Sequence, residues 1–211
     1  MSSLDDFEIV YGELKRYHGN RRKVVIPDSV EKIGASAFSG CEYITSVEVP
    51  EKVTEIGMYA FAQCYRLQSI NIPQGIKEIT SGVFHNCEKL MALDIPDSVE
   101  KIYGQAFTNC SSLGRVSFHS KPQIAKTAFD KFSNHVWFDM PYSFPNESIR
   151  NHSVSESCKL ILSGEYRDEQ IKVWRKYIQA QRKRLYALAL SNNYVLQYMV
   201  QNEVISADEI D

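Results

Sequence analysis

The chain has 211 residues, of which 44% are hydrophobic and 24% are charged, as is ordinary for a globular protein. Its net charge of −2 creates no overall field that would attract nucleic acid or anionic lipid. No apolar run reaches the roughly 18 residues of a membrane span, and the N-terminal segment lacks the apolar core of a secretory signal. We therefore expect a cytoplasmic location for the sequence as given, or a cell-surface or secreted one if the natural chain carries a leader.

The N-terminal segment FEIVYGELKRYHG, residues 7–19, predicts a β-hairpin that turns at Tyr11 and Gly12. Val24 and Ile26 follow in alternate positions, as in a strand. A stack of repeats exposes apolar surface and an unpaired strand edge at each end. We therefore expect residues 1–26 to form an N-terminal cap.

The next segment repeats four times with a period of 23 residues, starting at Pro27, Pro50, Pro73 and Pro96. Eight apolar positions recur in each unit, and in the first unit they are Val30, Ile33, Ala37, Phe38, Cys41, Ile44, Val47 and Val49. A unit of this size cannot bury its own apolar face, but stacked copies share a continuous core. The period therefore predicts a solenoid.

The last two apolar positions of each unit predict a short strand, with both side chains inward and the residue between them outward. Stacked strands of this kind form a parallel ladder with a spacing of about 4.7–4.9 Å. The proline that follows cannot donate a hydrogen bond and ends the strand. The middle of each unit is too short for a long helix, and we expect a turn or 3₁₀ segment that directs the phenylalanine inward.

The first unit reads IPDSVEKIGASAFSGCEYITSV. It resembles the BspA-like class of bacterial leucine-rich repeats, whose pattern runs roughly I-P-x-x-V-x-x-I-x-x-x-A-F-x-x-C-x-x-L-x-x-I. The likeness covers residues 24 to about 140, with departures at Val83, where alanine is usual, and His119, where a proline should stand. The resemblance implies a curved leucine-rich repeat solenoid that typically serves protein–protein or host-surface recognition, and it implies no catalysis.

Four cysteines recur at the same repeat position: Cys41, Cys64, Cys87 and Cys110. Zinc sites need close spacings such as C-x₂₋₄-C, which are absent here. Stacked positions lie within the Cα distance range of a disulfide, so a bridge is the main alternative. In a decayed fifth unit, residues 122–141, the cysteine position holds Phe132, which indicates an inward apolar position. We expect buried free thiols, with Cys158 on a helix outside the repeats.

The 23-residue period stops after Pro145, and helical patterns follow. A serine-rich helix is expected before Gly164, and a second from about Asp168 that runs to Leu190 or breaks near Gln181. A third candidate lies in NNYVLQYMVQNEV, with Val195 and Met199 inward and Leu196 as a further candidate for an inward position, and Ser206 to Glu209 matches a capping box. These helices would form a small bundle that is docked on or tethered to the solenoid.

The predicted fold is thus an α/β-type solenoid, a leucine-rich repeat with a parallel β-ladder and short turns or 3₁₀ segments, plus a small C-terminal helical bundle. Residues 27–140 hold four full repeats and one decayed repeat, and residues 141–211 are helical.

For function, we expect a non-enzymatic protein–protein interaction module that uses the concave face, with surface or host recognition as one form. Its outward residues are Ser46, Glu48, Ser69, Asn71, Ala92, Asp94, Arg115 and Ser117. No catalytic, cofactor-binding or metal-binding residues are predicted, and no cofactor is expected. The partner is expected to be a protein, and the oligomeric state stays open.

Two alternatives remain. The helical region carries a basic concentration that could contact an acidic protein or nucleic acid: Lys172, Arg175, Lys176, Arg182, Lys183 and Arg184. An enzyme would need a cleft between solenoid and bundle, around His135 and Trp137. His85 stands beside Asn86 and Cys87, but it occupies a variable polar position, which predicts an exposed side chain rather than a nucleophile pair.

Overall fold

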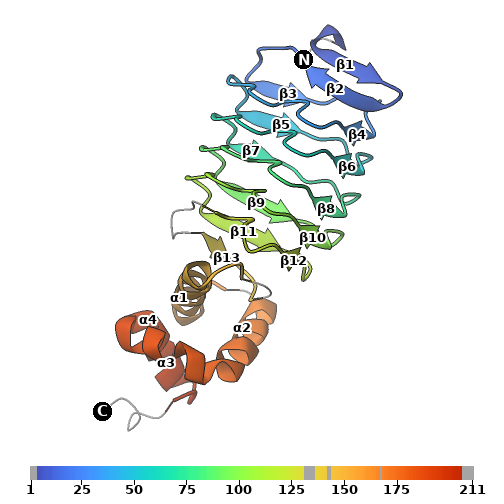
Figure 1. The fold of residues 1–211 in the computed structure, drawn as a ribbon. Coiled ribbons are helices and arrows are strands. Elements are labelled where there is room, and N and C mark those ends of the chain that lie inside the picture. The colour runs from blue at the N-terminus through green and yellow to red at the C-terminus, as the bar shows by residue number, and fades with distance from the viewer. Residues whose placement is uncertain (1–3, 131–135, 142–143, 167, 206–211) are drawn as a thin grey trace.

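The computed structural model describes residues 4–130, 136–141, 144–166 and 168–205. It shows a stack of flat coils followed by four helices, with the two termini at opposite ends (Figure 1). A 3₁₀ turn, η1 (Leu4–Asp6), opens the chain. The solenoid predicted from the 23-residue period is confirmed.

The predicted strands form a first ladder along one side of the stack. Its strands are β3 (Lys23–Val25), β5 (Ser46–Glu48), β7 (Ser69–Ile70), β9 (Ala92–Ile95), β11 (Arg115–Phe118) and β13 (Trp137–Phe138). Val24 pairs in parallel with Val47, and Val47 with Ile70. β9, β11 and β13 form a second parallel set, and no pairing joins β7 to β9 within the described residues. The two sets nevertheless remain in contact.

A second ladder, which the sequence patterns did not predict, runs along another side of each coil. Its members after the hairpin are β4 (Lys32–Ile33), β6 (Glu55–Ile56), β8 (Glu78–Ile79), β10 (Lys101–Ile102) and β12 (Gln123–Ile124). Each has only two residues, so only one side chain can point inward and no alternation appears in the sequence. In β4, β6, β8 and β10 that side chain is a buried isoleucine.

The predicted hairpin consists of β1 (Phe7–Val10) and β2 (Glu13–Tyr17), paired antiparallel. Tyr11 and Gly12 both have positive φ, at 51° and 77°, which is the geometry of a two-residue turn that matches strand twist. β2 also pairs in parallel with β4, so the hairpin covers the end of the second ladder.

Phenylalanine rings stack through the centre of the solenoid, one for each coil. The order is Tyr17, Phe38, Phe61, Phe84, Phe107 and Phe129, with neighbouring ring centroids 4.8–5.8 Å apart. All six rings are buried, and each aromatic pair contributes about 0.5–1.5 kcal/mol beyond its buried area. Tyr17 takes the phenylalanine position in the hairpin, so the cap continues the core.

The coil turns tightly on either side of each buried phenylalanine. Two positions per coil have positive φ: Ser36, Tyr59, Gly82 and Gln105 before the phenylalanine, and Gly40, Gln63, Asn86 and Asn109 after it. The glycines and asparagines at these positions tolerate this conformation at modest cost, whereas Ser36, Gln63 and Gln105 adopt it against their ordinary preference. Tyr59 is a bulky exception, and its ring lies over Gly82 of the next coil.

The C-terminal region contains α1 (Glu147–Ser163), α2 (Asp168–Ala180), α3 (Arg182–Ser191) and α4 (Asn193–Gln201). Asn146 caps α1 by accepting a hydrogen bond from the Ile149 N–H at 2.9 Å, and Gly164 ends it in the left-handed conformation. Of the two arrangements left open, a helix running to Leu190 or one that breaks near Gln181, the structure shows the break. In α4, Val195 and Met199 are buried as expected, whereas Leu196 is only half-buried. The predicted capping box at 206–209 lies outside the described residues.

Serine side chains of α1 attach the helices to the last strand of the first ladder. The Phe138 N–H donates to Ser153 Oγ at 2.9 Å, and Trp137 Nε1 donates to Ser157 Oγ at 3.2 Å. Both serines are fully buried. An end strand has unpaired backbone groups, and the Ser153 hydroxyl satisfies one of those on β13, whereas the Ser157 hydroxyl satisfies the indole N–H of Trp137. The helical region is therefore docked on the solenoid.

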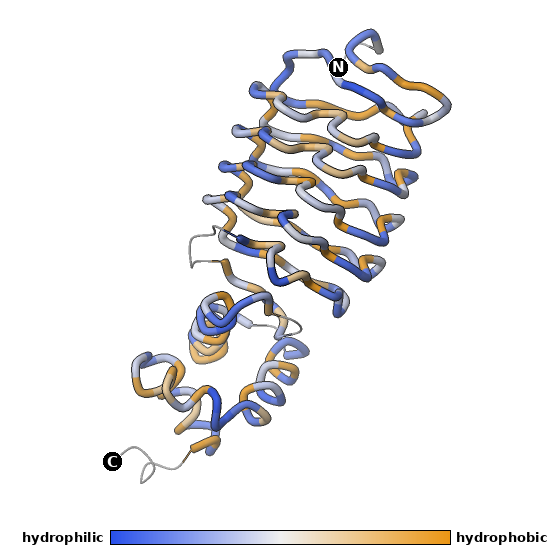
Figure 2. Tube along the Cα trace, viewed as in Figure 1, coloured by the Kyte–Doolittle hydropathy of each residue, from blue (hydrophilic) through white to orange (hydrophobic). Residues whose placement is uncertain are grey.

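The core follows the hydropathy pattern of the chain, with apolar segments lining the inside of every coil (Figure 2). A second apolar cluster lies among the helices and includes Trp174, Tyr198 and Met199. The aromatic contacts continue from one cluster to the other, because Phe129 touches Phe138 and Phe138 stacks on Phe144 at 5.8 Å.

Candidate binding groove on the first ladder

The eight predicted outward residues all lie on the face of the first ladder. Six of them are exposed, and Ser46 and Ser117 are half-buried. Buried neighbours fix their direction: Val47 and Val49 flank Glu48, and Leu93 and Ile95 flank Asp94. The alternation of a strand therefore presents these side chains to solvent, as the sequence predicted.

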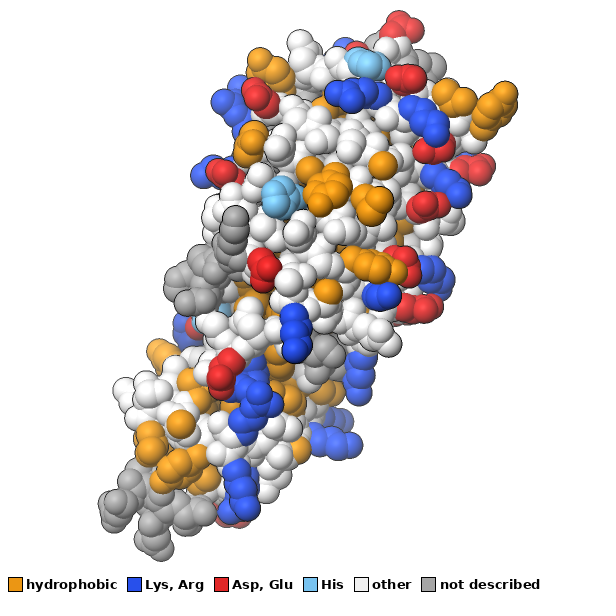
Figure 3. Space-filling view, viewed as in Figure 1, with side chains coloured by type: hydrophobic (Ala, Val, Ile, Leu, Met, Phe, Trp, Pro, Cys, Tyr) orange, Lys and Arg blue, Asp and Glu red, His pale blue; other side chains and the backbone are white. Residues whose placement is uncertain are grey.

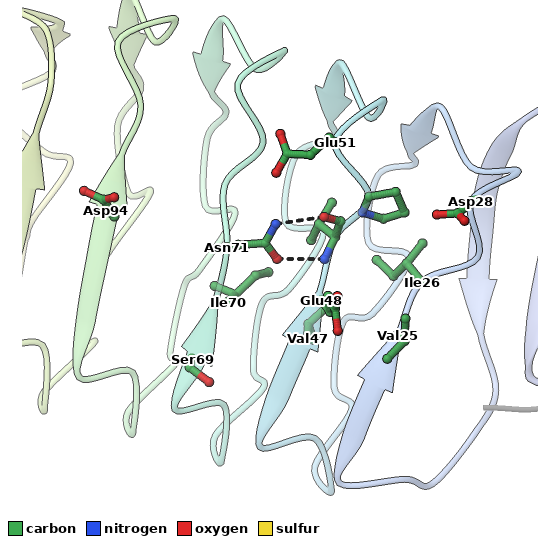
Figure 4. A pocket seen from close by; sticks show the side chains of 12 residues that line it. Val25, Ile26, Asp28, Val47, Glu48, Glu51, Ser69, Ile70, Asn71 and Asp94 are labelled. Atoms are coloured by element: carbon green, nitrogen blue, oxygen red, sulfur yellow. Dashed lines mark hydrogen bonds between the residues drawn. The ribbon is translucent and has the colours of Figure 1, made fainter. Parts of the chain in front are cut away.

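Two hollows lie on this face, and together they line up along the solenoid. The first, of about 850 Å³, is lined by residues of β3, β5 and β7 and by Asp28 and Glu51 (Figure 4). The second, of about 840 Å³, is lined by residues of β9 and β11 and by the start of α2. Ile70 and Asp94 line both, so the hollows adjoin. We call the combined depression the groove.

The groove contains nearly all of the predicted binding residues. Of the eight, only Ser46 lines neither hollow. It also contains acidic residues that the outward positions of the strands did not include. Asp28 and Glu51 directly follow the prolines that begin the first and second repeat units. Their shared repeat position could therefore have identified them from the sequence. Asp168 and Glu169 reach the groove from α2, and no sequence signal pointed to them.

Asn71 is exposed, but its amide is engaged by the backbone. Its Oδ1 accepts from the Val49 N–H at 2.8 Å, and its Nδ2 donates to the Val49 carbonyl at 2.8 Å (Figure 4). Asp139, which follows β13, binds in a similar way, since its Oδ1 accepts from the Phe118 N–H at 3.0 Å. These side chains extend the ladder where strand pairing ends.

At the C-terminal end of the groove, basic and acidic side chains lie close to one another. The guanidinium carbon of Arg115 lies over the Trp137 ring, 4.9 Å from the ring centroid, and one of the guanidinium nitrogens is 3.4 Å from Asp139 Oδ2. His119 Nε2 is 2.8 Å from Asp94 Oδ1. Asp139 is buried, so the guanidinium partly compensates a carboxylate that lacks contact with water.

The repeated cysteines are free thiols. Cys64, Cys87 and Cys110 are buried, and each Sγ donates to the phenylalanine carbonyl of the preceding coil, at 3.0–3.2 Å. Cys41 is half-buried, and Cys158 is buried in α1. Burial raises the pKa of Cys41 to about 11 and the pKa of Cys110 and Cys158 to about 12. Thiols of this kind pack the core and are poor nucleophiles at neutral pH. The position of Phe132 lies outside the described residues.

One expectation about the histidines was wrong. His85 is half-buried rather than exposed, because the ring of Tyr59 packs edge-on against its imidazole, with the two ring centroids 6.3 Å apart. His135, the residue proposed for an interdomain cleft, lies outside the described residues. In the described part of the chain, no group of three His, Cys, Asp or Glu side chains is placed to hold a metal ion.

The basic side chains of the helical region are exposed at all six predicted positions. Figure 3 shows Lys and Arg gathered over the helices, whereas acidic and basic side chains are interspersed along the solenoid. The pair Lys32 and Glu55, with Nζ 2.9 Å from Oε2, is an example from the second ladder. Among the helices that the structure describes, none has the length and apolar character to cross a membrane.

Comparison with known protein families identifies the same repeat that the sequence pattern indicated. The pattern of the BspA type leucine rich repeat region matches residues 16–136 in six copies, which includes the end of β2. A leucine-rich repeat protein of T. pallidum is 29% identical over 59% of this chain and 64% of its own, with a TM-score of 0.55. A leucine rich cell surface protein of Faecalibacterium prausnitzii is 35% identical over 50% of this chain and 28% of its own, with a TM-score of 0.48.

The chain thus spans less than two thirds of both solved structures. The comparison with curated proteins gave no match. The solenoid fold is supported by the T. pallidum structure, and the repeat supports a protein-interaction module at the general level.

Proposed function

The chain belongs to the BspA type leucine-rich repeat proteins, and from this premise we propose that it binds a protein partner in the groove of the first ladder. The observation that carries the proposal is the coincidence of two adjoining hollows with seven of the eight outward residues predicted from the repeat. Strand side chains held by a rigid core lose little freedom on binding, so less of the association free energy is spent on ordering them.

A photo-crosslinking residue placed at Ser69 of the full chain tests this proposal. Ser69 lines the groove and is exposed, whereas Tyr43 is exposed and lines neither hollow, so Tyr43 is the matched control position. Extracts of the producing organism and of host surfaces would be irradiated with each variant. We expect a discrete protein adduct from Ser69 only, lost when Glu48→Lys and Asp94→Lys are added. Equal adducts from both positions would contradict the proposal.

Recognition at a cell or host surface is the finer form of this proposal. Its support is the membership of a repeat family that the sequence resemblance links to such recognition. Antibody labelling of intact producing cells tests it, because an intracellular protein is labelled only after the cells are permeabilised.

The exposed basic side chains of α2 and α3 favour a second candidate, in which the helical region binds an acidic partner. Under this alternative the solenoid serves as a spacer. The substitutions Lys172→Glu and Lys176→Glu would then abolish capture of the partner, whereas Glu48→Lys with Asp94→Lys would leave it unchanged. The opposite result supports the groove.

A further inference from the structure

The first hollow is lined by carboxylates, and no basic side chain is among its lining residues. Asp28, Glu48, Glu51 and Asp94 line it, and none of its other lining residues is Lys, Arg or His. Figure 4 shows the four carboxylates spread over several coils rather than meeting at one point. Glu51 accepts a weak bond from the Gln74 N–H at 3.3 Å, and His119 approaches Asp94 from the second hollow. This part of the groove therefore attracts positive charge.

Between the carboxylates, the hollow has an apolar lining. Val25 is exposed by 53% although it lies on a strand, and Ile70 and Pro50 also contribute to the surface. A small hydrated cation gains nothing from apolar surface, and dispersed carboxylates cannot surround one ion. A peptide that carries both basic and apolar side chains matches both properties of the lining.

The spacing of the carboxylates restricts the partner further. Glu48 and Asp94 occupy the same repeat position two coils apart, and parallel strands lie about 4.8 Å apart, so their backbones are separated by about 10 Å. A segment in the polyproline II conformation rises about 3.1 Å per residue with three residues per turn, so its residues i and i+3 point to the same side and are about 9 Å apart. A segment that runs along the solenoid would match these acids with basic residues at positions i and i+3.

We propose that the occupant of the groove is an extended basic segment of a partner protein in the polyproline II conformation, with Lys or Arg at every third position. The inference rests on the proposed function and names the chemical class of its partner. The carboxylates Asp28, Glu48, Glu51 and Asp94 contact the basic side chains, and the apolar lining contacts the residues between them.

Fluorescence anisotropy with three labelled peptides tests this inference on the full chain. The first peptide has lysines at every third position separated by Gly and Val, the second has the same composition with its lysines consecutive, and the third has glutamate in place of lysine. We expect the first to bind most tightly and the third not to bind. Binding should weaken with added salt, because the screening length falls from about 10 Å at 0.1 M to about 3 Å at 1 M.

A matched pair of variants locates the site. Glu48→Lys with Asp94→Lys should weaken binding of the first peptide by about tenfold or more, since two attractive contacts become repulsive. Glu42→Lys with Glu100→Lys makes the same charge change at exposed positions outside the groove, and should alter binding by less than about twofold. Circular dichroism melting of both variants checks that they are folded.

Several results would overturn the inference. Equal weakening by the two variant pairs would mean that only the overall charge matters, and equal binding of spaced and consecutive lysines would remove the argument from spacing. Displacement of the spaced peptide by Ca²⁺ or spermine, at matched ionic strength, would point to a small cation. If the Ser69 crosslink is found but the peptides do not discriminate, the proposed function stands and this inference fails.

Discussion

The buried cysteines make the stability of the fold sensitive to alkaline pH. A thiol that stays neutral in the folded protein but ionises in the unfolded chain stabilises the fold fully below its ordinary pKa of 9.0. That contribution is lost as the pH rises from 9 toward the folded pKa, which is about 12 for Cys110 and Cys158. Burial also raises the pKa of Cys64 and Cys87. The fold is therefore expected to lose stability as the pH rises above 9.

The magnitude follows from the number of buried thiols. At pH 10, one unit above the ordinary pKa, each neutral buried thiol lowers the free energy of unfolding by about 1.4 kcal/mol. Four such thiols, those of Cys64, Cys87, Cys110 and Cys158, together give about 5–6 kcal/mol. Most domains have a total stability of about 5–15 kcal/mol. The half-buried Cys41 is left out of the sum, because solvent screens its charge.

Urea unfolding followed by circular dichroism, in a phosphine reductant at about pH 7.5 and about pH 10, measures this loss. Cys110→Ala should reduce the difference between the two pH values by about 1.4 kcal/mol, whereas Cys41→Ala should reduce it by less. Tyrosine and lysine ionisation is common to all variants and cancels in the comparison. An unchanged difference in Cys110→Ala would refute the reasoning, as would rapid reaction of the buried thiols with a thiol reagent in the folded state.

Two further predictions concern packing. Gly82→Ala should destabilise the fold by about 1–2 kcal/mol, because its Cβ would meet the Tyr59 ring and φ is positive. In a Tyr59→Ala background the cost of Gly82→Ala should fall to that of the backbone strain alone, about 1 kcal/mol. A double-mutant cycle measured by urea unfolding tests this, and additive effects of the two substitutions would contradict the reasoning. Trp174→Phe removes the bond from Nε1 to the Asp139 carbonyl at 2.9 Å and should cost about 1–2 kcal/mol. Urea unfolding measures this too, and a value near zero would mean that this contact does not hold the helices.

Much of the solenoid could be predicted because each inward position recurs four times. Val47 alone says little, but Val47, Ile70, Leu93 and Val116 at equal spacing identify one layer of the core, and all four are buried. The second ladder could not be predicted in the same way. Its strands have two residues, so they show no alternation, and their hydrogen bonds depend on the neighbouring coil rather than on local sequence.

The helical region was predictable at its ends and less so in its contacts. Gly164 ends α1 in the left-handed conformation, as the sequence predicted, and Asn146, a local signal that was not singled out beforehand, caps its start. The serines of α1 looked only like weak helix formers. Their burial against β13 depends on docking, which no periodicity encodes. The same holds for Asp168 and Glu169, which join the groove because α2 begins beside the first ladder.

The part of the groove that the repeat does predict is also its most rigid part. Glu48 and Asp94 extend from strands whose inward neighbours are buried, and those neighbours pack on a ring stack that continues through Phe138 and Phe144 to the helices. The acids therefore cannot change their spacing without disturbing the core. A flexible surface would accept lysines at many spacings, since it could adjust to each. A fixed spacing must instead discriminate between peptides of equal charge, so the contrast between spaced and consecutive lysines tests the rigidity of the solenoid as well as the identity of its partner.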